Sequence, residues 1–476
     1  MQMQSQPQSQ PMSAPGKRTV SLALALILLI VGIGAGAGVT YVSLLAGGSF
    51  NSGLCSSGRT LTIGMLTDLS SDLASQGTRA RDAAQLAIMD INSYLSSPQG
   101  AATTGTVACN VKFAVSVTDY ALDGAKALSA LQTFASAGVQ VVVGPLNSGA
   151  AQNILQYANS NHIALISPSS TSVALAIPND YLFRTAPNDR WQGQADSAML
   201  KAEGATKVII LQRHDTYGDA LANATAVNFA GSGTIDYNAC VAADTVCILR
   251  YDTSLKTFGS IIPTLTSDYQ ALNTGSDMNK VAIDSISFEE FGEIVIEISQ
   301  SSNTATKALL TSDTLPGTGS GTTHIWTGTD GQAQDTVISG NVTSGPIVST
   351  IRLPSTIYGF QNTTKTLALQ KNFSGNYTGI VCDNYCRGAY DDIWLGALAT
   401  LNAGAYDGTK IQAVMLGVSN NYYGVTGPTS LEASGDRVAT IYEIWKVVTP
   451  SGGSPTWVYG GYWDATSNTL VSFNPY

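Results

Sequence analysis

The sequence predicts an α/β protein made of doubly wound parallel sheets, with enough chain for two lobes. Short apolar runs rich in β-branched residues alternate with segments of helical length along most of the chain, which is the pattern of parallel βαβ units. The chain has 476 residues, of which 44% are hydrophobic, so it can bury one large core or two of ordinary size. Two lobes are the favoured arrangement at this length.

Strands are expected at 61–66, 111–117, 141–143 and 163–166, and helices at 79–95, 124–137 and from about 150 to 161. The strands at 141–143 and 163–166 bracket one helix, and each ends in a turn rich in Gly, Pro, Ser and Thr. Both turns therefore lie at the carboxyl ends of neighbouring strands, where small ligands bind because helix N-termini and free backbone N–H groups converge on an anion. The alternative is that Ser148 and Thr171 in these turns only cap helices.

Charge and composition exclude one class of partner. The formal net charge is −10, and it is −12 without Lys17 and Arg18 of the N-terminal tail. A nucleic-acid partner would need a basic face, so none is expected. The low charge and the abundance of Gly, Ser, Thr and Asn favour an extracellular protein.

The N-terminus predicts a membrane segment. Residues 1–18 are expected to be a disordered cytosolic tail, 19–46 an uncharged apolar run, and 47–59 a Gly/Ser linker. The run is long enough to cross the ~30 Å hydrocarbon core as a signal-anchor helix, with Lys17 and Arg18 on the inner side. A signal peptide cleaved at Ala35-Gly36-Ala37 is the alternative. The predicted location is the extracellular side of the cell surface, anchored by this helix, or secretion if the signal is cleaved.

Six cysteines outside the apolar run predict disulfides. Cys55 and Cys109 each precede a strand of the same sheet at the same edge, so they form a sensible pair. Two further pairs enclose short loops, Cys240 with Cys247 and Cys382 with Cys386. The spacing lacks C-x-x-C and nearby His, so no zinc site is expected.

Enzymatic activity is not expected. The three His residues lie in different segments, and no G-x-S-x-G, H-E-x-x-H or P-loop pattern occurs. The adjacent carboxylates Glu289-Glu290 and Asp391-Asp392 are typical of solvated positions rather than catalytic ones. No cofactor is expected.

Ten short motifs resemble those of type I periplasmic binding proteins, and most closely the leucine/isoleucine/valine-binding branch of ABC-transporter solute-binding proteins. They occur in the right order from about 60 to 463: Thr67-Asp68-Leu69-Ser70, Gly77, Asp119, Gly144-Pro145 with Ser148, Ser167-Pro168-Ser169-Ser170-Thr171, Phe183-Arg184-Thr185, Asp215-Thr216-Tyr217-Gly218, Gly328-Thr329-Asp330-Gly331, Gly388-Ala389-Tyr390-Asp391-Asp392, and Gly424-Val425-Thr426-Gly427-Pro428 with Gly435-Asp436-Arg437.

The resemblance implies two lobes joined by three crossing segments. These are expected at 185–189, 347–354 and 425–431, which gives lobe 1 residues 60–185 and 354–425, and lobe 2 residues 186–353 and 426–476. The second lobe would use strands at 208–211, 285–288 and 324–326. The runs at 440–445 and 456–459 lack a helical partner and need an existing sheet to join, which favours interleaved lobes over two sequential domains split near 190.

The resemblance also implies a ligand site. Ser148, Ser169 and Thr171 would hold the carboxylate of an amino acid, and Tyr217 matches an aromatic of the second lobe that closes over the ligand. Asp330 stands where the family has a Glu that pairs with the ligand's α-ammonium, and the alternative is that it forms an Asx turn or caps a helix.

Two further residues are candidates for the site. Gln76 replaces a Tyr of the branched-chain binders, which makes the pocket more polar. Trp191 is a candidate to face the cleft, and the alternative is that it belongs to the core.

The expected function is a membrane-tethered extracellular solute-binding protein. It would close its lobes on a small polar molecule, an amino acid or amide, and deliver it to the permease subunits of an ABC transporter. A ligand-sensing receptor ectodomain and a structural surface protein are the alternatives.

Overall fold

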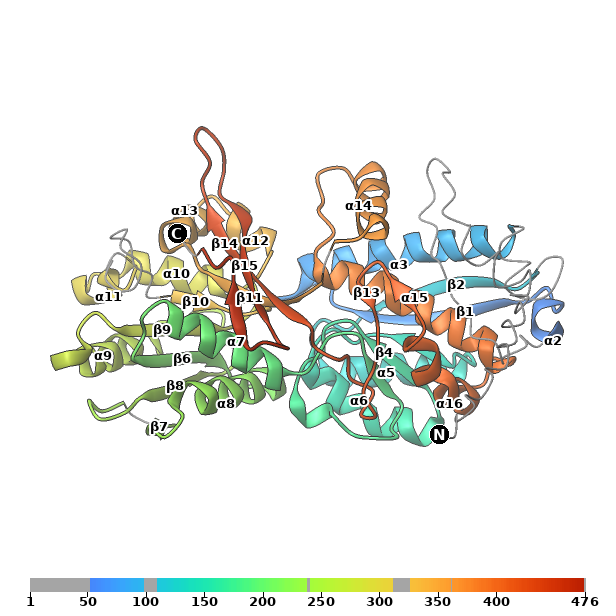
Figure 1. Cartoon of the computed structure of the whole chain (residues 1–476), viewed down its shortest axis with the longest axis horizontal. Helices are drawn as coiled ribbons and strands as arrows, with labels where there is room; N and C mark the ends of the chain where they lie inside the picture. The colour runs from blue at the N-terminus through green and yellow to red at the C-terminus, as the bar shows by residue number, and fades with distance from the viewer. Residues whose placement is uncertain (1–51, 98–108, 238–239, 311–325, 361, 475–476) are drawn as a thin grey trace, which may run out of the picture. The chain divides into compact units, whose positions relative to one another are not determined.

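A computed structural model of the chain describes residues 52–97, 109–237, 240–310, 326–360 and 362–474. All of them belong to one compact unit, Gly38–Tyr476. The fold consists of two large β-sheets with helices on both faces of each (Figure 1). The predicted α/β class is therefore confirmed.

The first sheet has five parallel strands in the order β2-β1-β3-β4-β5. Val141, Val143 and Ile166 point to one face and pack with α3 and α15, whereas Val142 and Leu165 point to the other and pack with α5 and α6. Because both faces of β3 and of the first three residues of β4 are covered by helices, these positions are all apolar. The strands are β1 (Thr60–Thr67), β2 (Lys112–Asp119), β3 (Val141–Val143), β4 (Ala164–Ser167) and β5 (Leu182–Arg184).

The helices of the first lobe come from two parts of the chain. The early ones are α2 (Ser52–Cys55), α3 (Ala74–Leu95), α5 (Gly124–Ser136), α6 (Ser148–Asn161) and the 3-10 turn η1 (Val173–Leu175); the late ones are α14 (Thr364–Asn376), α15 (Asn384–Ala403) and α16 (Gly408–Ser419). α15 is buried at every position from 384 to 401. It lies close to the sheet at Gly396, where an added Cβ would come within 2.9 Å of Val141.

The second sheet has nine strands in the order β16-β15-β14-β11-β10-β9-β6-β8-β7. The first six along the chain are parallel, and β14, β15 and β16 are antiparallel additions. The terminal strands thus join an existing sheet, as their lack of a helical partner predicts. The strands are β6 (Lys207–Arg213), β7 (Ile235–Asp236), β8 (Val246–Tyr251), β9 (Val281–Ile286), β10 (Trp326–Gly328), β11 (Ser355–Gly359), β14 (Ile441–Val448), β15 (Thr456–Asp464) and β16 (Thr469–Val471).

Helices cover both faces of this sheet as well. α7 and α8 lie on one side of it, and α9, α10 and α13 on the other. The elements are α7 (Asp189–Ala202), α8 (Thr216–Ala230), α9 (Ile262–Leu272), η2 (Gly275–Asp277), α10 (Phe291–Gln300), α11 (Thr304–Ala308), α12 (Thr336–Gly340) and α13 (Ser344–Ile351), and a small hairpin of β12 (Tyr423–Gly424) and β13 (Gly427–Pro428) belongs to neither sheet.

The chain passes between the sheets three times, but two passages differ from the predicted positions. The first lies between β5 and α7, where the sequence places it. The second was expected at 347–354, yet β11 still belongs to the second sheet, so the chain leaves it only after Gly359. The third was expected at 425–431, yet Asp436 still bridges to Arg184 of the first lobe, so the passage precedes β14.

One strand boundary also needs correction. The strand expected at 285–288 is β9, Val281–Ile286, and Phe288 lies beyond its end. Phe288 is thereby placed in the turn at the carboxyl edge of the sheet.

The three predicted disulfides are confirmed. Cys55–Cys109, Cys240–Cys247 and Cys382–Cys386 are all bonded, and no cysteine is free. Cys55 and Cys109 precede β1 and β2, which are parallel neighbours.

The predicted membrane anchoring is corrected. In the part of the chain that the structure describes, no helix is both long enough and apolar enough to cross a membrane. The tail, the apolar run and the start of the linker, residues 1–51, lie outside the described residues. Anchorage at the cell surface therefore forms no part of the function proposed below.

Candidate ligand-binding site

A small cavity lies between the two lobes, at the carboxyl ends of strands from both sheets. The first lobe contributes the start of α3, the turns after β3 and β4, and the first turn of α15. The second lobe contributes the start of α8 and the turns after β9 and β10. The lining residues are Leu73, Gln76, Leu146, Asn147, Ser148, Ser169, Tyr217, Phe288, Asp330, Gly331 and Tyr385.

The Ser148 hydroxyl ties the two turns of the first lobe together. Its Oγ accepts the backbone N–H groups of Thr171 at 3.2 Å and Ser172 at 3.1 Å. Ser148 is the first residue of α6, whose N-cap is Asn147, and Ser172 rather than Thr171 caps η1. The capping alternative is therefore wrong for both residues. The hydroxyl proton of Ser148 and the unpaired N–H groups of the first turn of α6 stay available to an anion.

Hydrogen bonds hold these turns in place. The Tyr120 hydroxyl donates to Asn147 Oδ1 at 2.8 Å and accepts the N–H groups of Leu146 and Asn147. The hydroxyls of Ser167 and Ser169 donate to the carbonyls of Pro145 and Leu146, at 2.7 and 2.8 Å. The anion-facing groups are thus fixed before any ligand arrives.

Asp330 projects from the turn after β10 and is 3% exposed. Its Oδ1 accepts from the Tyr217 hydroxyl at 2.6 Å and from Gln192 Nε2 at 3.0 Å, and its Oδ2 accepts from the Tyr385 hydroxyl. Burial raises the pKa of this carboxyl, and the three donors oppose that rise. Asp330 does not cap a helix, since the next helix, α12, is capped by Asp335. Within the turn, the N–H of Thr329 donates to Gln332 Oε1.

Tyr217 forms a wall of the cavity and also supports Asp330. Its ring stacks on Phe288, with centroids 5.4 Å apart and planes at 17°, and the Arg213 guanidinium lies 3.6 Å from the Phe288 centroid. Burial and the neighbouring Asp330 raise the pKa of the Tyr217 hydroxyl, so it stays a donor.

A second buried carboxyl, that of Asp189, lies near Thr171 and Asp330. Asp189 is fully buried at the start of α7, and its N–H donates to the carbonyl of Thr171 at 2.8 Å. The Thr171 hydroxyl is near enough to stabilise the charged form, but no donor among the described residues makes a well-aligned hydrogen bond to this carboxylate. Burial first, and then the charge of Asp330, raise the pKa of Asp189.

The structure brings together most of the residues expected at the site. Gln76, Ser148, Ser169, Tyr217 and Asp330 line one cavity, and Thr171 lies directly behind Ser148. The Gln76 side chain reaches across the lobes to the carbonyl of Gly331, with 3.4 Å from Nε2 to O.

Trp191 does not line this cavity. It is half-buried on α7, and the Arg190 guanidinium lies 4.9 Å from its ring centroid. The next residue, Gln192, points inward and contacts Asp330, because neighbouring helix positions face about 100° apart.

Several residues that form or support the site were not predicted. Asp189 and Gln192 lie close to Trp191 in the sequence, Phe288 was assigned to a strand, and Tyr385 lies within the predicted Cys382–Cys386 loop but was not singled out. A signal existed for Phe288, since the turn after every parallel strand faces the same edge.

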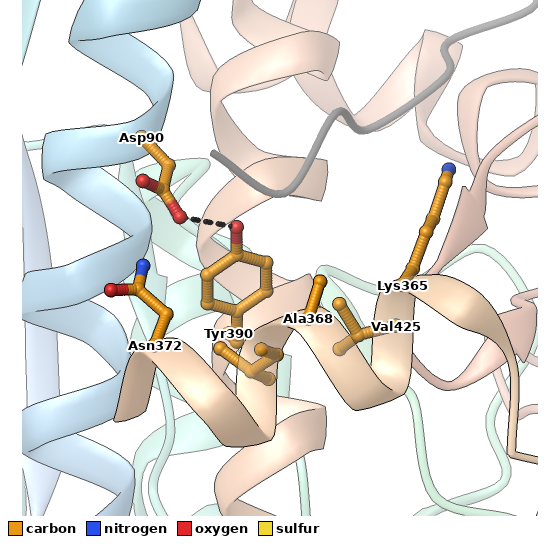
Figure 2. A pocket seen from close by; sticks show the side chains of 7 residues that line it. Asp90, Lys365, Ala368, Asn372, Tyr390 and Val425 are labelled. Atoms are coloured by element: carbon orange, nitrogen blue, oxygen red, sulfur yellow. Dashed lines mark hydrogen bonds between the residues drawn. The ribbon is translucent and has the colours of Figure 1, made fainter. Parts of the chain in front are cut away.

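A second, small pocket lies away from this site (Figure 2). Asp90 of α3 accepts a hydrogen bond from the Tyr390 hydroxyl of α15 at 2.8 Å, and Lys365 of α14 points away from this pair. All its walls belong to the first lobe, so closing of the lobes would not enclose a ligand there.

Among the described residues, no group of three His, Cys, Asp or Glu side chains could hold a metal ion.

The model of the receptor family ligand binding region matches residues 79–449 of the chain. The chain belongs to this family. An uncharacterized protein of Methanocaldococcus jannaschii is 26% identical over 457 residues, which cover 90% of this chain and 98% of that protein. Glutamate receptor 3.4 of Arabidopsis thaliana is 23% identical over 369 residues, which cover 70% of this chain and 34% of the receptor.

Solved structures share the fold. Leucine binding protein LivK of Thermotoga maritima has a TM-score of 0.65 at 15% identity, over 86% of this chain and 99% of LivK. LivJ of Streptococcus pneumoniae, a branched-chain amino acid transporter substrate binding protein in complex with isoleucine, has a TM-score of 0.61 at 21% identity, over 84% of this chain and all of LivJ. The fold is that of the type I periplasmic binding proteins, as the motifs predict.

Proposed function

We propose that the protein captures an amino acid, or an amide of similar size, between its two lobes and delivers it to an ABC permease. The observation that carries this proposal is the polarity of the cavity. One end offers hydroxyls and the N-terminus of α6, and the other offers the carboxyl of Asp330. A zwitterion fits such a site with its carboxylate toward the first lobe and its ammonium toward the second.

The anion end comprises Ser148, Ser169 and Thr171. Backbone N–H dipoles at a helix N-terminus stabilise a carboxylate without any Arg or Lys. None of the described residues that line the cavity is Arg or Lys, so the ligand's carboxylate would depend on these dipoles and on the Ser148 hydroxyl.

The cation end comprises Asp330, with Asp189 nearby. Asp330 is held by donors that favour its charged form, and burial alone would leave a carboxylate costly without a cation. A ligand ammonium supplies the missing positive charge. Asp is one bond shorter than the Glu of the resembling proteins, so the ammonium would be drawn toward the second lobe.

The wall at Gln76 argues against leucine itself as the ligand. Its amide lies at the cavity and hydrogen-bonds across the lobes. A purely aliphatic side chain offers no hydrogen bond to the remaining donor and acceptor of this amide, whereas a polar one does. A polar side chain or an amide is the better match.

Delivery to a permease is supported by the similarity to LivJ, which is the substrate binding protein of a branched-chain amino acid transporter. Ligand sensing is the second candidate, since the matched part of glutamate receptor 3.4 covers 70% of this chain. Three disulfides favour an oxidising compartment for either role.

A thermal-shift screen over amino acids, amides and sugars tests the proposal. A ligand at 100 times its Kd adds about 2.7 kcal/mol of stability, so an amino acid or amide should raise the melting temperature by several degrees. If no amino acid or amide shifts it while a sugar does, the proposed ligand class is wrong. Co-purification with the permease subunits then separates transport from sensing.

A further inference from the structure

The two lobes touch at a second place, outside the cavity, where α3 meets the turn after β9. The Ser75 N–H donates to Glu289 Oε1 at 2.9 Å, and the Ser75 hydroxyl donates to Asp335 Oδ2 at 3.0 Å. The Glu289 N–H donates in return to the carbonyl of Asp72 at 3.1 Å. One residue of the first lobe therefore joins two carboxyls of the second.

Most of the charged groups around this contact are paired with other residues. Arg79 of α3 is 3% exposed and pairs with Asp383 at 2.7 Å, and its Nη1 lies 3.4 Å from Thr336 Oγ1. Asp72 pairs with Lys256 at 3.2 Å on the exposed side. Glu290 turns away from the contact to Arg213 and Tyr251.

Glu289 and Asp335 are thus two neighbouring carboxyls that share the field of one guanidinium. Asp335 also accepts the N–H groups of Val337 and Ile338 at the start of α12, which favours its charged form. Burial first, and then the charge of Asp335, raise the pKa of Glu289 to about 7, against the Arg79 charge and the Ser75 hydrogen bonds. When the lobes separate, water solvates both carboxyls and this penalty disappears.

We infer that the contact of Ser75 with Glu289 and Asp335 is a proton-linked latch, in which closing of the lobes binds one proton from solvent at this carboxyl pair. Glu289 is then a positioning residue, which sets how readily the lobes close without touching the ligand. The inference deepens the proposed function, since it takes closing of the lobes as the step that captures the ligand.

The direction of the pH effect follows from the two forms. In the closed form the Glu289 pKa is about 7, whereas a solvated Glu has a value near 4.5. The closed form therefore binds more protons between these values, and closing becomes less favourable as pH rises through about 7. Between pH 8 and pH 5, the ratio of closed to open molecules should rise roughly tenfold to a hundredfold from this group.

Distance measurements between two spin labels test this without any ligand. Met89 on α3 and Val227 on α8 are 52% and 55% exposed, one on each lobe, and Met89→Cys and Val227→Cys would be the only free thiols, since all six native cysteines are bonded. Pulsed electron resonance then reports the populations of the closed and open distances at pH 5 and pH 8.

In the doubly labelled protein, the closed-to-open ratio should be at least about tenfold higher at pH 5 than at pH 8. Glu289→Gln keeps the acceptor for the Ser75 N–H and should lose most of this increase. Glu293→Gln, an exposed position on α10, is the matched control and should respond as the parent does. Asp330 is also buried on closing, and its response is common to all three proteins.

An equal pH response in the parent and in Glu289→Gln, or no response in the parent, would overturn the latch. Circular dichroism at both pH values checks that each variant is folded. Because no solute is present, failure of the latch is distinguishable from failure of the proposed ligand class, which the thermal-shift screen decides.

Discussion

At the residue scale, the site depends on a few side chains whose hydrogen bonds are already made. Ser148 joins the turns after β3 and β4, and Asp330 is held by three donors from α7, α8 and α15. Preorganised groups lose little entropy on binding, which favours affinity for a small ligand. Each of these two residues leads to a prediction.

Asp330→Asn should weaken binding of a cationic ligand by about 3–5 kcal/mol, or about two to four decades in Kd, because it leaves the ligand's charge buried and unpaired. Isothermal titration of the wild type and the variant measures this. A neutral amide that binds the wild type is the internal control, and its Kd should change far less. A cationic ligand bound within threefold of wild type by the variant would contradict the assigned role.

Ser148→Ala should weaken binding by about 0.5–3 kcal/mol, the range for one hydrogen bond. It should also lower the free energy of unfolding, since the N–H groups of Thr171 and Ser172 lose their acceptor. Titration and urea unfolding measure the two effects. Ser160→Ala, at the exposed end of α6, is the control. Lower stability with an unchanged Kd would leave Ser148 a purely structural residue.

At the element scale, the first lobe could be predicted well and the second less well. β3 and β4 are apolar runs that end in turns rich in Gly, Pro and Ser, so their carboxyl ends and Ser148 could be placed from the sequence. β11 could not, because Pro354-Ser355-Thr356 has the composition of a turn. In the fold, the Thr356 hydroxyl donates to Asp196 and accepts from Gln192, so this polar strand is satisfied inside the second lobe.

Helix burial explains two further misses. α15 is buried at every position from 384 to 401, so no 3.6-residue periodicity marks it, and Tyr385 in its first turn was not recognised as a site residue. Asp189 was missed because an Asp in the first turn of a helix is usually explained by its favourable interaction with the helix dipole. Only the tertiary fold shows that its side chain lies beside Thr171 and Asp330.

The disulfides should differ in what they contribute. In the chain-entropy model, the bridge Cys55–Cys109, which closes 54 residues, should contribute about 4 kcal/mol, and Cys382–Cys386, which closes 4 residues, about 2 kcal/mol. Unfolding of the two paired Cys→Ser variants in guanidinium measures the difference. A larger loss for the shorter loop would show that native contacts at α15, rather than chain entropy, dominate.

At the scale of the whole molecule, buried carboxyls make the stability depend on pH. Burial raises the pKa of Asp284 to about 6 and that of Asp180 to about 7, both above the value of 3.8 for a free Asp. Between about pH 4 and pH 7 the folded chain therefore binds more protons than the unfolded chain. The stability that these two carboxyls contribute is fully present below about pH 4 and is lost as pH rises through 6–7.

The melting temperature should consequently fall as pH rises from 5.5 to 8. Asp284→Asn should remove part of that slope and raise stability at pH 8 by an amount on the order of 2–3 kcal/mol, because a neutral amide replaces a buried charge. Scanning calorimetry at several pH values measures both proteins. A melting temperature that rises over this range would mean that these carboxyls stay ionised in the folded chain.

The central claim is that a zwitterionic solute binds between the lobes, with Ser148 at one end and Asp330 at the other. A crystal structure grown with the compound that gives the largest thermal shift tests it most directly. The account predicts the ligand's carboxylate within hydrogen-bond distance of Ser148 Oγ and its ammonium within hydrogen-bond distance of the Asp330 carboxylate. Density for that compound in the pocket beside Asp90 and Tyr390, with the interlobe cavity empty, would contradict it.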